Sequence, residues 1–240
     1  MKRIRLRTGP AALFGAVFLI ALIALLPMRL VLGWIGLGDL GLTARQVRGS
    51  VWFGELSEAH VAGVDLGDLA AHLSPVRLLV GRARVDLHQR GDSAVPVQGA
   101  VTLSRHSISV DDISASIAGG SAFAPLPMTS LDLDDVSVRF ADGACDHAEG
   151  RVRATLAGAI GGVLLPQAMA GAARCDGKAL LLPLVSTAGT EALQLRILAD
   201  GSYTANLAMQ AGDAAAATKM QLAGFRPSPN GYLLSIVGRF

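Results

Sequence analysis

The fold is decided by two stretches, Leu193-Gln-Leu-Arg-Ile197 and Tyr203-Thr-Ala-Asn-Leu-Ala-Met209, in which every second residue is apolar or aromatic. Successive side chains of a β-strand point to opposite faces, so this period of two predicts strands with one buried face. Asp200-Gly201 lies between them and is typical of a turn. The two stretches therefore predict a β-hairpin, and Leu180-Leu-Leu-Pro-Leu184 has the same alternation just upstream.

The same pattern runs through most of the chain beyond Gly41. Residues 131–140 alternate but change phase at Asp134-Asp135, where a β-bulge would absorb one extra residue. Residues 75–81 and 211–220 predict short helices. Further turn signals divide the strands at Gly91-Asp92, Gly119-Gly120, Asp142-Gly143, Asp176-Gly177 and Asn230-Gly231. Many strands at short intervals predict a mainly β protein with an antiparallel sheet.

The N-terminus carries a different signal. Four basic residues within positions 2–7 precede an uncharged apolar run from Thr8 to Met28. A helix needs about 20 apolar residues to cross a bilayer, and this run reaches that length if it continues past Pro27 and Arg29 to Leu32. The basic residues before the span orient the N-terminus toward the cytoplasm. We expect residues 1–33 to be a cytoplasmic tail and transmembrane anchor, and residues 34–240 to form one periplasmic β-rich domain.

A cleaved signal peptide is the alternative for the same segment. The apolar region of a signal peptide is typically about 7–15 residues long and ends at a site of small residues. This run is longer, and Pro27-Met-Arg-Leu30 offers no such site, which favours the anchor. Both readings place most of the chain outside the cytoplasm.

The charge of that exported part argues against nucleic-acid binding. Without the five basic residues at positions 2, 3, 5, 7 and 29, the chain has 16 Lys and Arg against 19 Asp and Glu, a net charge of −3. A nucleic-acid partner would call for a basic surface. We therefore expect no nucleic-acid partner.

Cys145 and Cys175 are the only cysteines of the sequence, and both follow the apolar run. Disulfides persist in the periplasm, so we favour a Cys145–Cys175 bridge over two separate buried thiols, which would behave as small hydrophobic residues.

Catalytic and metal-binding patterns are not found in the sequence. The five histidines do not occur at metal-ligand spacing. Asp132, Asp134 and Asp135 could suggest calcium ligands, but Asp132 and Asp134 alternate with Leu131 and Leu133 as the solvent-exposed face of a strand, which is the interpretation that we favour. Ser104-Arg-His106 lacks a defined third partner, and no phosphate-binding or nucleophile motif is present. We expect no enzyme, no metal and no cofactor.

A set of short segments in a particular order carries a resemblance. Gly49 and Gly54 flank Trp52 within Val47-Arg-Gly-Ser-Val-Trp-Phe-Gly54. The segments that follow are Leu66-Gly-Asp-Leu69, Leu73-Ser-Pro-Val-Arg-Leu-Leu-Val-Gly81, Cys145 with Gly150, Cys175-Asp-Gly177, Asp200-Gly-Ser-Tyr203 and Leu222-Ala-Gly-Phe-Arg-Pro227. Together they resemble the type II secretion system protein N family over nearly the whole chain. The chain departs from the family after Pro227, where it turns directly and a longer insert is common.

The resemblance implies a single-pass protein of the bacterial inner membrane, with a periplasmic C-terminal domain. It implies an accessory or scaffold role that depends on contacts with other type II secretion subunits, with no small-molecule substrate. The family is also similar to AsmA-like envelope proteins, whose curved sheets present an apolar trough to lipid. An AsmA-like curved antiparallel sheet is therefore the expected fold, inner-membrane lipids are expected partners, and lipid binding or handling is the alternative function.

The residues of the first segments also have direct physical interpretations. Gly49 and Gly54 permit a tight turn around Trp52, whose indole would fill the core or contact a partner. Pro75 suits the first turn of a short helix, and Gly81 suits its left-handed end. Because unpaired strand edges bind other chains, we expect partner contacts at edge segments near Val51 and Ile236.

Overall fold

The computed structural model describes residues 10–28, 42–61, 64–78, 80–91, 96–118, 128–160 and 163–239. Its helices are α1 (Pro10–Ala24), α3 (Pro75–Leu78) and α4 (Ala214–Leu222). Its strands are β1 (Leu42–Gly49), β2 (Gly54–Val61), β3 (Val64–Leu73), β4 (Ala83–Gln89), β5 (Gln98–Leu103), β6 (Ser107–Ala118), β7 (Met128–Ala141), β8 (Ala144–Leu156), β9 (Ala159–Ile160), β10 (Val163–Leu164), β11 (Ala168–Ala172), β12 (Arg174–Asp176), β13 (Ala179–Ser186), β14 (Glu191–Ile197), β15 (Ser202–Met209), β16 (Arg226–Ser228) and β17 (Gly231–Arg239).

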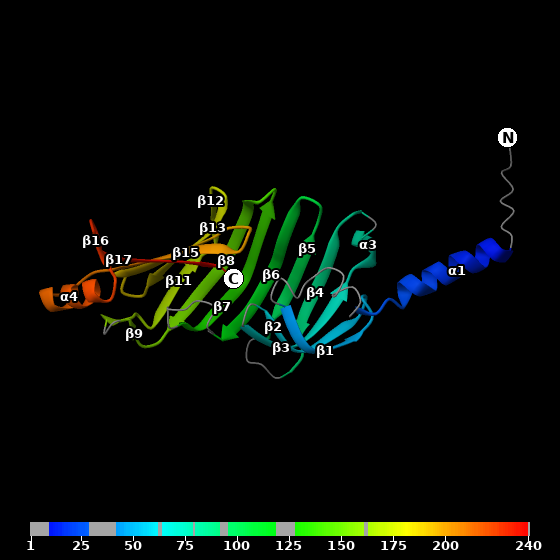
Figure 1. Cartoon of the computed structure of the whole chain (residues 1–240), viewed down its shortest axis with the longest axis horizontal. Coiled ribbons are helices and arrows are strands. Elements are labelled where there is room, and N and C mark those ends of the chain that lie inside the picture. The colour runs from blue at the N-terminus through cyan, green and yellow to red at the C-terminus, as the bar shows by residue number, and fades with distance from the viewer. Residues whose placement is uncertain are drawn as a thin grey trace.

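One 15-stranded antiparallel sheet dominates the described residues, and its strands follow the order β1 to β8, β11, β13, β14, β15, β17 and β16. Strand β12 pairs with β13 beside this path, and β9 and β10 form a separate hairpin. Neighbours in the sheet are mostly neighbours in sequence, as expected of strands joined by short turns. The predicted mainly β, antiparallel fold is confirmed. Helix α1 leaves the sheet at its β1 end, and α4 lies at the opposite end (Figure 1).

The core of the C-terminal half is built from rows of apolar side chains on one face. Leu184, Leu193, Leu207 and Leu234 are cross-strand neighbours on β13, β14, β15 and β17. The first three of these are at most 2% exposed. The next row has Leu182, Leu195, Ala205 and Ile236 at equivalent positions. The alternation predicted for β13, β14 and β15 therefore produces one continuous buried face.

The N-terminal half has a smaller apolar cluster. Leu56 of β2 lies opposite Leu69 of β3, and both are buried together with Ala71 and Met28. Ion pairs connect separate segments of this half, including Arg90–Glu55 and Arg84–Asp111, and Arg84 also pairs with Asp86 within β4. This half therefore has less buried apolar area to stabilise it.

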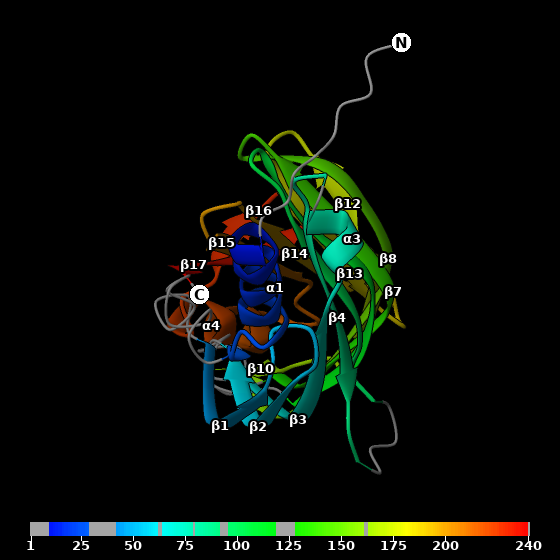
Figure 2. The ribbon, with the colours of Figure 1, turned by 90° about the vertical axis from the view of Figure 1, so that its right-hand side faces the viewer.

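Bulges bend the sheet along its length. Glu58, Asp112 and Asp135 have φ values of 48°, 52° and 49°, and each lies at a shift of strand register. A bulge adds one residue to one strand and increases the local bend and twist. The bulge predicted at Asp134-Asp135 is confirmed. Figure 2 shows the resulting curvature, with β7 and β8 on one side and β15 and β17 on the other.

Each bulge is held by side-chain hydrogen bonds to its backbone. The amide of Asp112 donates to Ser137 Oγ over 2.9 Å, and the amide of Asp135 donates to Ser114 Oγ over 3.2 Å. Gly150 lies opposite the Asp135 bulge with φ +109°, and a Cβ atom there would be 2.5 Å from the Asp135 carbonyl oxygen. Glycine at this position is what lets β8 pass close to the bulge.

Helix α1 differs from the expected span. It ends at Ala24, and Pro27 instead forms a bridge with Ser50, so the helix does not continue through Pro27. Proline lacks the amide hydrogen and disfavours helical geometry in the residue before it. Among the described residues, none of the helices combines the length and apolar character needed to cross a bilayer. Residues 29–41, including the expected domain boundary at 33/34, lie outside the described residues.

The two other helices lie close to their predicted positions. Pro75 begins α3, and Gly81 follows it with φ +73° and donates its amide to the carbonyl of Leu78 over 3.0 Å. Helix α4 begins after Asp213, whose carboxylate accepts a hydrogen bond from the Ala216 amide over 2.6 Å. This N-cap explains why the helix starts later than Ala211.

Candidate contact surfaces

The turn between β1 and β2 shows why two glycines flank Trp52. Gly49 lies opposite Gly54 and has φ +88°, and a Cβ on it would be 2.2 Å from the Phe53 carbonyl oxygen. Gly54 is buried, and a Cβ on it would be 1.8 Å from Met28 Sδ. The turn is therefore packed directly against the chain that follows α1.

This packing opens an apolar groove at the β1 end of the sheet. Trp52 is half-buried and Phe53 is 69% exposed, and both line the groove together with Leu73, Pro75 and Val76. The groove holds about 660 Å³, and Ala24 at the end of α1 also lines it. Trp52 is thus neither fully buried in the core nor remote from the surface, and Pro75 contributes to the same groove.

The opposite end of the sheet presents an open strand edge. Strand β16 covers only residues 231–233 of β17, so in the described part of the chain no strand pairs with the outer side of residues 234–239. Ser228 and Gly231 flank a two-residue turn and form a hydrogen-bonded pair. By the antiparallel alternation, the backbone groups of Ser235, Val237 and Arg239 then point away from β15. Val237 is 76% exposed.

The edge at β1 is built differently. Strand β1 carries the exposed cationic side chains of Arg45 and Arg48, and Arg45 pairs with Glu58 of β2 over 2.6 Å. Charged side chains on an edge strand disfavour pairing with another chain. Val51 does not lie on this edge, because it is in the turn and donates its amide to the Leu26 carbonyl over 3.0 Å. The expected edge segment near Val51 is thus strand β1, which ends at Gly49 and begins the sheet, and a partner contact there stays a prediction.

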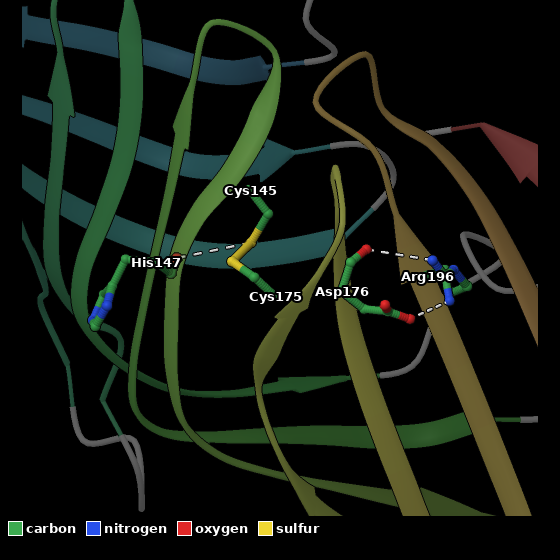
Figure 3. The surroundings of a disulfide bond; sticks show 5 residues. All are labelled: Cys145, His147, Cys175, Asp176 and Arg196. Atoms are coloured by element: carbon green, nitrogen blue, oxygen red, sulfur yellow. Dashed lines mark hydrogen bonds and ion pairs between the residues drawn. A yellow bond between two sulfur atoms is a disulfide. The ribbon is translucent and has the colours of Figure 1, made fainter.

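Cys145 and Cys175 are joined by a disulfide with a Cα–Cα distance of 5.5 Å (Figure 3). The bridge links β8 to the short strand β12. Beside it, Arg196 of β14 forms an ion pair with Asp176 of β12. The bridge and the ion pair together hold β12 between β8 and β14.

The side chains of Ser104 and His106, which were considered as catalytic candidates, make contacts within turns of the sheet. The Ser104 hydroxyl is 2.7 Å from the Ser107 hydroxyl, and His106 Nδ1 is 3.4 Å from an Asp142 oxygen at an exposed turn. Within the described ranges, no group of three or more His, Cys, Asp or Glu side chains could hold a metal ion.

The aspartates of β7 are likewise occupied by neighbouring strands. Asp132 accepts a hydrogen bond from the Ser116 hydroxyl over 2.5 Å, and Asp134 pairs with Arg151 over 3.1 Å. Asp135 accepts one from the Ser114 hydroxyl over 3.3 Å. These contacts are those of cross-strand polar pairs on the solvated face of a sheet.

The pKa of the Asp200 carboxyl group, in the turn before β15, is lowered. The Ser202 hydroxyl and amide both donate to Asp200, over 2.6 and 3.0 Å, and these hydrogen bonds lower the pKa of the Asp200 carboxyl. The nearby Arg239 guanidinium lowers the pKa further. The turn thus favours a charged carboxylate.

The sequence pattern singles out Trp52, Pro75 and an edge near Ile236, but not the exposed apolar residues beside them. Phe53, Val76 and Val80 are each about 70% exposed at the groove end, and Val237 is exposed at the β17 edge. A signal was available for Phe53 and Val80, because they are apolar residues at turn positions, where polar residues are usual. For Val237 no local signal distinguishes an outer strand from an inner one.

Comparisons with known proteins bear on the identity of this fold. The family model described as Type II secretion system (T2SS), protein N matches residues 40–234. The type II secretion system protein N of Vibrio cholerae serotype O1 (strain ATCC 39315 / El Tor Inaba N16961) is 27% identical over 151 residues, which is 59% of this chain and 60% of that relative. The chain thus aligns with about 60% of that relative's length.

No solved structure shows a significant match, so the likeness to AsmA-like proteins stays a prediction. The family match runs from just before β1 into β17, and it includes the glycines and the tryptophan of the first turn as well as both cysteines. The match confirms the resemblance stated from the ordered segments. This chain belongs to the type II secretion system protein N family.

Proposed function

We propose that this chain is a non-enzymatic contact subunit of the type II secretion system, which binds another secretion subunit by strand addition to the outer edge of β17. An extended segment of the partner would pair with the backbone of Ser235, Val237 and Arg239. Such augmentation obtains its affinity from main-chain hydrogen bonds and its specificity from alternate side chains.

The observation that carries this proposal is the difference in length between β16 and β17. A three-residue strand covers one end of a nine-residue strand, and the rest of that edge is uncovered within the described residues. Exposed edges of this kind are usually blunted by charge, proline or bulges. Here only Arg239 is charged among residues 234–239, and Pro227 lies on β16 rather than β17.

The placement of the sheet is part of the same proposal. The apolar side chains of α1 are exposed, including Leu13, Phe14, Val17, Phe18, Leu19 and Leu22. A helix that is apolar on all sides requires burial in protein or lipid. We propose that the N-terminal segment holds the chain at the inner membrane, with the sheet in the periplasm. A reporter active only in the periplasm, fused after Phe240, tests this orientation.

The alternative of a lipid-handling protein has less support. It needs an apolar sheet face that is open to acyl chains. The side chains of Leu184, Leu193 and Leu207 on that face are instead 1–2% exposed. We therefore retain the protein-contact function.

The proposal is tested by the pair Val237→Pro and Val237→Thr. Proline removes the outward amide of residue 237 without removing a hydrogen bond to β15, whereas threonine keeps both the strand preference and the amide. We expect Val237→Pro to lower secretion of type II substrates in a complemented deletion strain, and Val237→Thr to leave it unchanged. Equal chain levels in the envelope provide the folding control. Normal secretion with Val237→Pro at that level would overturn the edge assignment.

A further inference from the structure

The groove at the β1 end combines three features that point to one kind of partner. Its rim is apolar and exposed, it is continuous with α1, and exposed basic side chains flank it. Trp52, Phe53, Val76 and Leu78 line the groove, and the exposed Val80 follows Leu78 by two residues; we call these five residues the apolar rim.

Several apolar side chains of the rim are highly exposed. Phe53 packs its ring edge-on against His72, with ring centroids 5.3 Å apart, yet most of its surface faces solvent. Val76 within α3 and Val80 just after it are each 71% exposed. Clustered apolar exposure of this kind marks a surface for a protein or a membrane.

Continuity with α1 favours a membrane. Ala24, the last residue of α1, is itself part of the groove wall, and the Leu26 carbonyl accepts a hydrogen bond from the Val51 amide in the same turn as Trp52. The exposed apolar surface of α1 therefore leads directly into the rim. Tryptophan and other aromatic residues are enriched where protein meets the headgroup region of a bilayer.

The charges around the rim also fit an anionic surface. Arg77 and Arg82 are exposed beside Val76 and Val80, and within the described residues neither has an acidic partner in ion-pair distance. Asp86 is the acidic residue of the groove, and its carboxylate is engaged by Arg84 over 2.9 Å. The net charge that faces outward here is therefore positive, as in segments that bind anionic lipids.

We propose that the apolar rim is immersed in the headgroup region of an anionic phospholipid bilayer, so that the β1 end of the sheet rests on the membrane. This inference depends on the proposed membrane location of α1. It adds a second contact, and two contacts fix the tilt of the sheet where one helix would leave it free to swing. Strand β17 begins at the end of the molecule remote from α1 and runs back toward its middle (Figure 1).

The test uses single cysteines on the full chain. The described residues contain no free cysteine, because Cys145 and Cys175 are bridged. Phe53→Cys and Val80→Cys report on the rim, and Leu222→Cys, at an 84% exposed residue of α4, is the matched control at the far end. Each is labelled with a polarity-sensitive dye and reconstituted in vesicles of phosphatidylethanolamine and phosphatidylglycerol, with and without brominated acyl chains.

We expect the dyes at positions 53 and 80 to emit at shorter wavelength and to be quenched several-fold more by bromine than the dye at position 222. Replacing Arg77 and Arg82 by glutamine should reduce this difference. If the chains float with the vesicles but the dyes at all three positions emit as in water, the chain is attached to the membrane through its N-terminal segment and the rim is not immersed. That result would overturn the proposal for the rim. Chains that fail to float would reject both. If the dye at position 53 emits at shorter wavelength only in native envelopes and not in lipid vesicles, a protein partner, and not lipid, covers the rim.

Discussion

The two ends of this sheet are built to different designs. The β1 end has a small core, several ion pairs and an apolar rim, and its edge strand carries Arg45 and Arg48. The β17 end has the buried leucine rows, which are the cross-strand neighbours of Leu193 and Leu195 on β13, β15 and β17, and it has helix α4. The uncovered part of its edge strand is mostly uncharged. The two halves share one unbroken antiparallel ladder, with β6 paired to β7.

This difference suggests a distinct role for each half of the sheet. The half with the larger core and the disulfide can tolerate an open edge, because its strands do not depend on that edge for burial. The half with the smaller core has a charged edge strand, and we propose that its apolar rim contacts the membrane. We infer that the C-terminal half is the rigid platform for a protein partner and the N-terminal half is the part that meets the membrane.

The largest expected effect is on the leucine rows. Leu207→Ala removes a side chain that is 1% exposed between Leu193 and Leu234, and we expect a loss of about 2–5 kcal/mol in the free energy of unfolding. Leu56→Ala in the smaller cluster should cost less, because fewer buried neighbours surround the cavity. Urea denaturation of both variants in the same detergent checks the order. A larger loss for Leu56→Ala would reverse the comparison between the halves.

The disulfide should stabilise the C-terminal half by about 2–5 kcal/mol. Its two cysteines are 30 residues apart in sequence, so it restricts the unfolded chain between β8 and β12. In Cys145→Ser, hydrogen exchange should become faster in β8, β12 and β13 and stay unchanged in β2 and β3. Free-thiol titration of the denatured, unreduced protein provides the check on the bridge itself. Two reactive thiols per chain would show that no bridge forms.

Replacing the glycine opposite a β-bulge should reduce the free energy of unfolding more than replacing a glycine in an open turn. Gly150→Ala combines a positive φ with a contact at 2.5 Å to the Asp135 carbonyl oxygen, and we expect it to cost about 1–3 kcal/mol. Gly143→Ala is the matched control, since Gly143 has φ +76° and nothing within 4 Å of its added Cβ. Backbone strain alone should then cost about 1 kcal/mol. Equal losses, measured by thermal unfolding, would show that the close approach at the bulge is not a constraint.

The smallest effect is expected at the turn next to β17. Hydrogen bonds from Ser202 lower the pKa of Asp200, so the folded state favours the carboxylate. The stabilisation is therefore present above the ordinary aspartate pKa, and it disappears as the pH falls through the lowered value. The stability difference between the native chain and Asp200→Ala should shrink on acidification, in an acid titration followed by circular dichroism. A difference that grew at low pH would contradict this sign.

The sequence predicted strands well and their partners poorly. Alternation located β13, β14 and β15, and the phase change at Asp134-Asp135 located a bulge, because both are periodicities of the local chain. The pairing of β8 with β11 and the short reach of β16 depend on contacts between distant segments. An outer edge such as that of Val237 is defined by which strand fails to pair, and periodicity carries no information about this. The anchor was expected to continue through Pro27, but local proline geometry ends the helix earlier.

The most direct test of the partner contact is a photo-crosslinking comparison of the two edges in envelopes of secreting cells. A photoreactive residue replaces either Val237 on β17 or Thr43 on β1, both of which are exposed. Our proposal predicts crosslinks from position 237 to a type II secretion subunit, abolished by adding Ser235→Pro to the same chain, and no subunit crosslinks from position 43. Subunit crosslinks from position 43 with none from position 237 would contradict the assignment of the β17 edge as the binding surface.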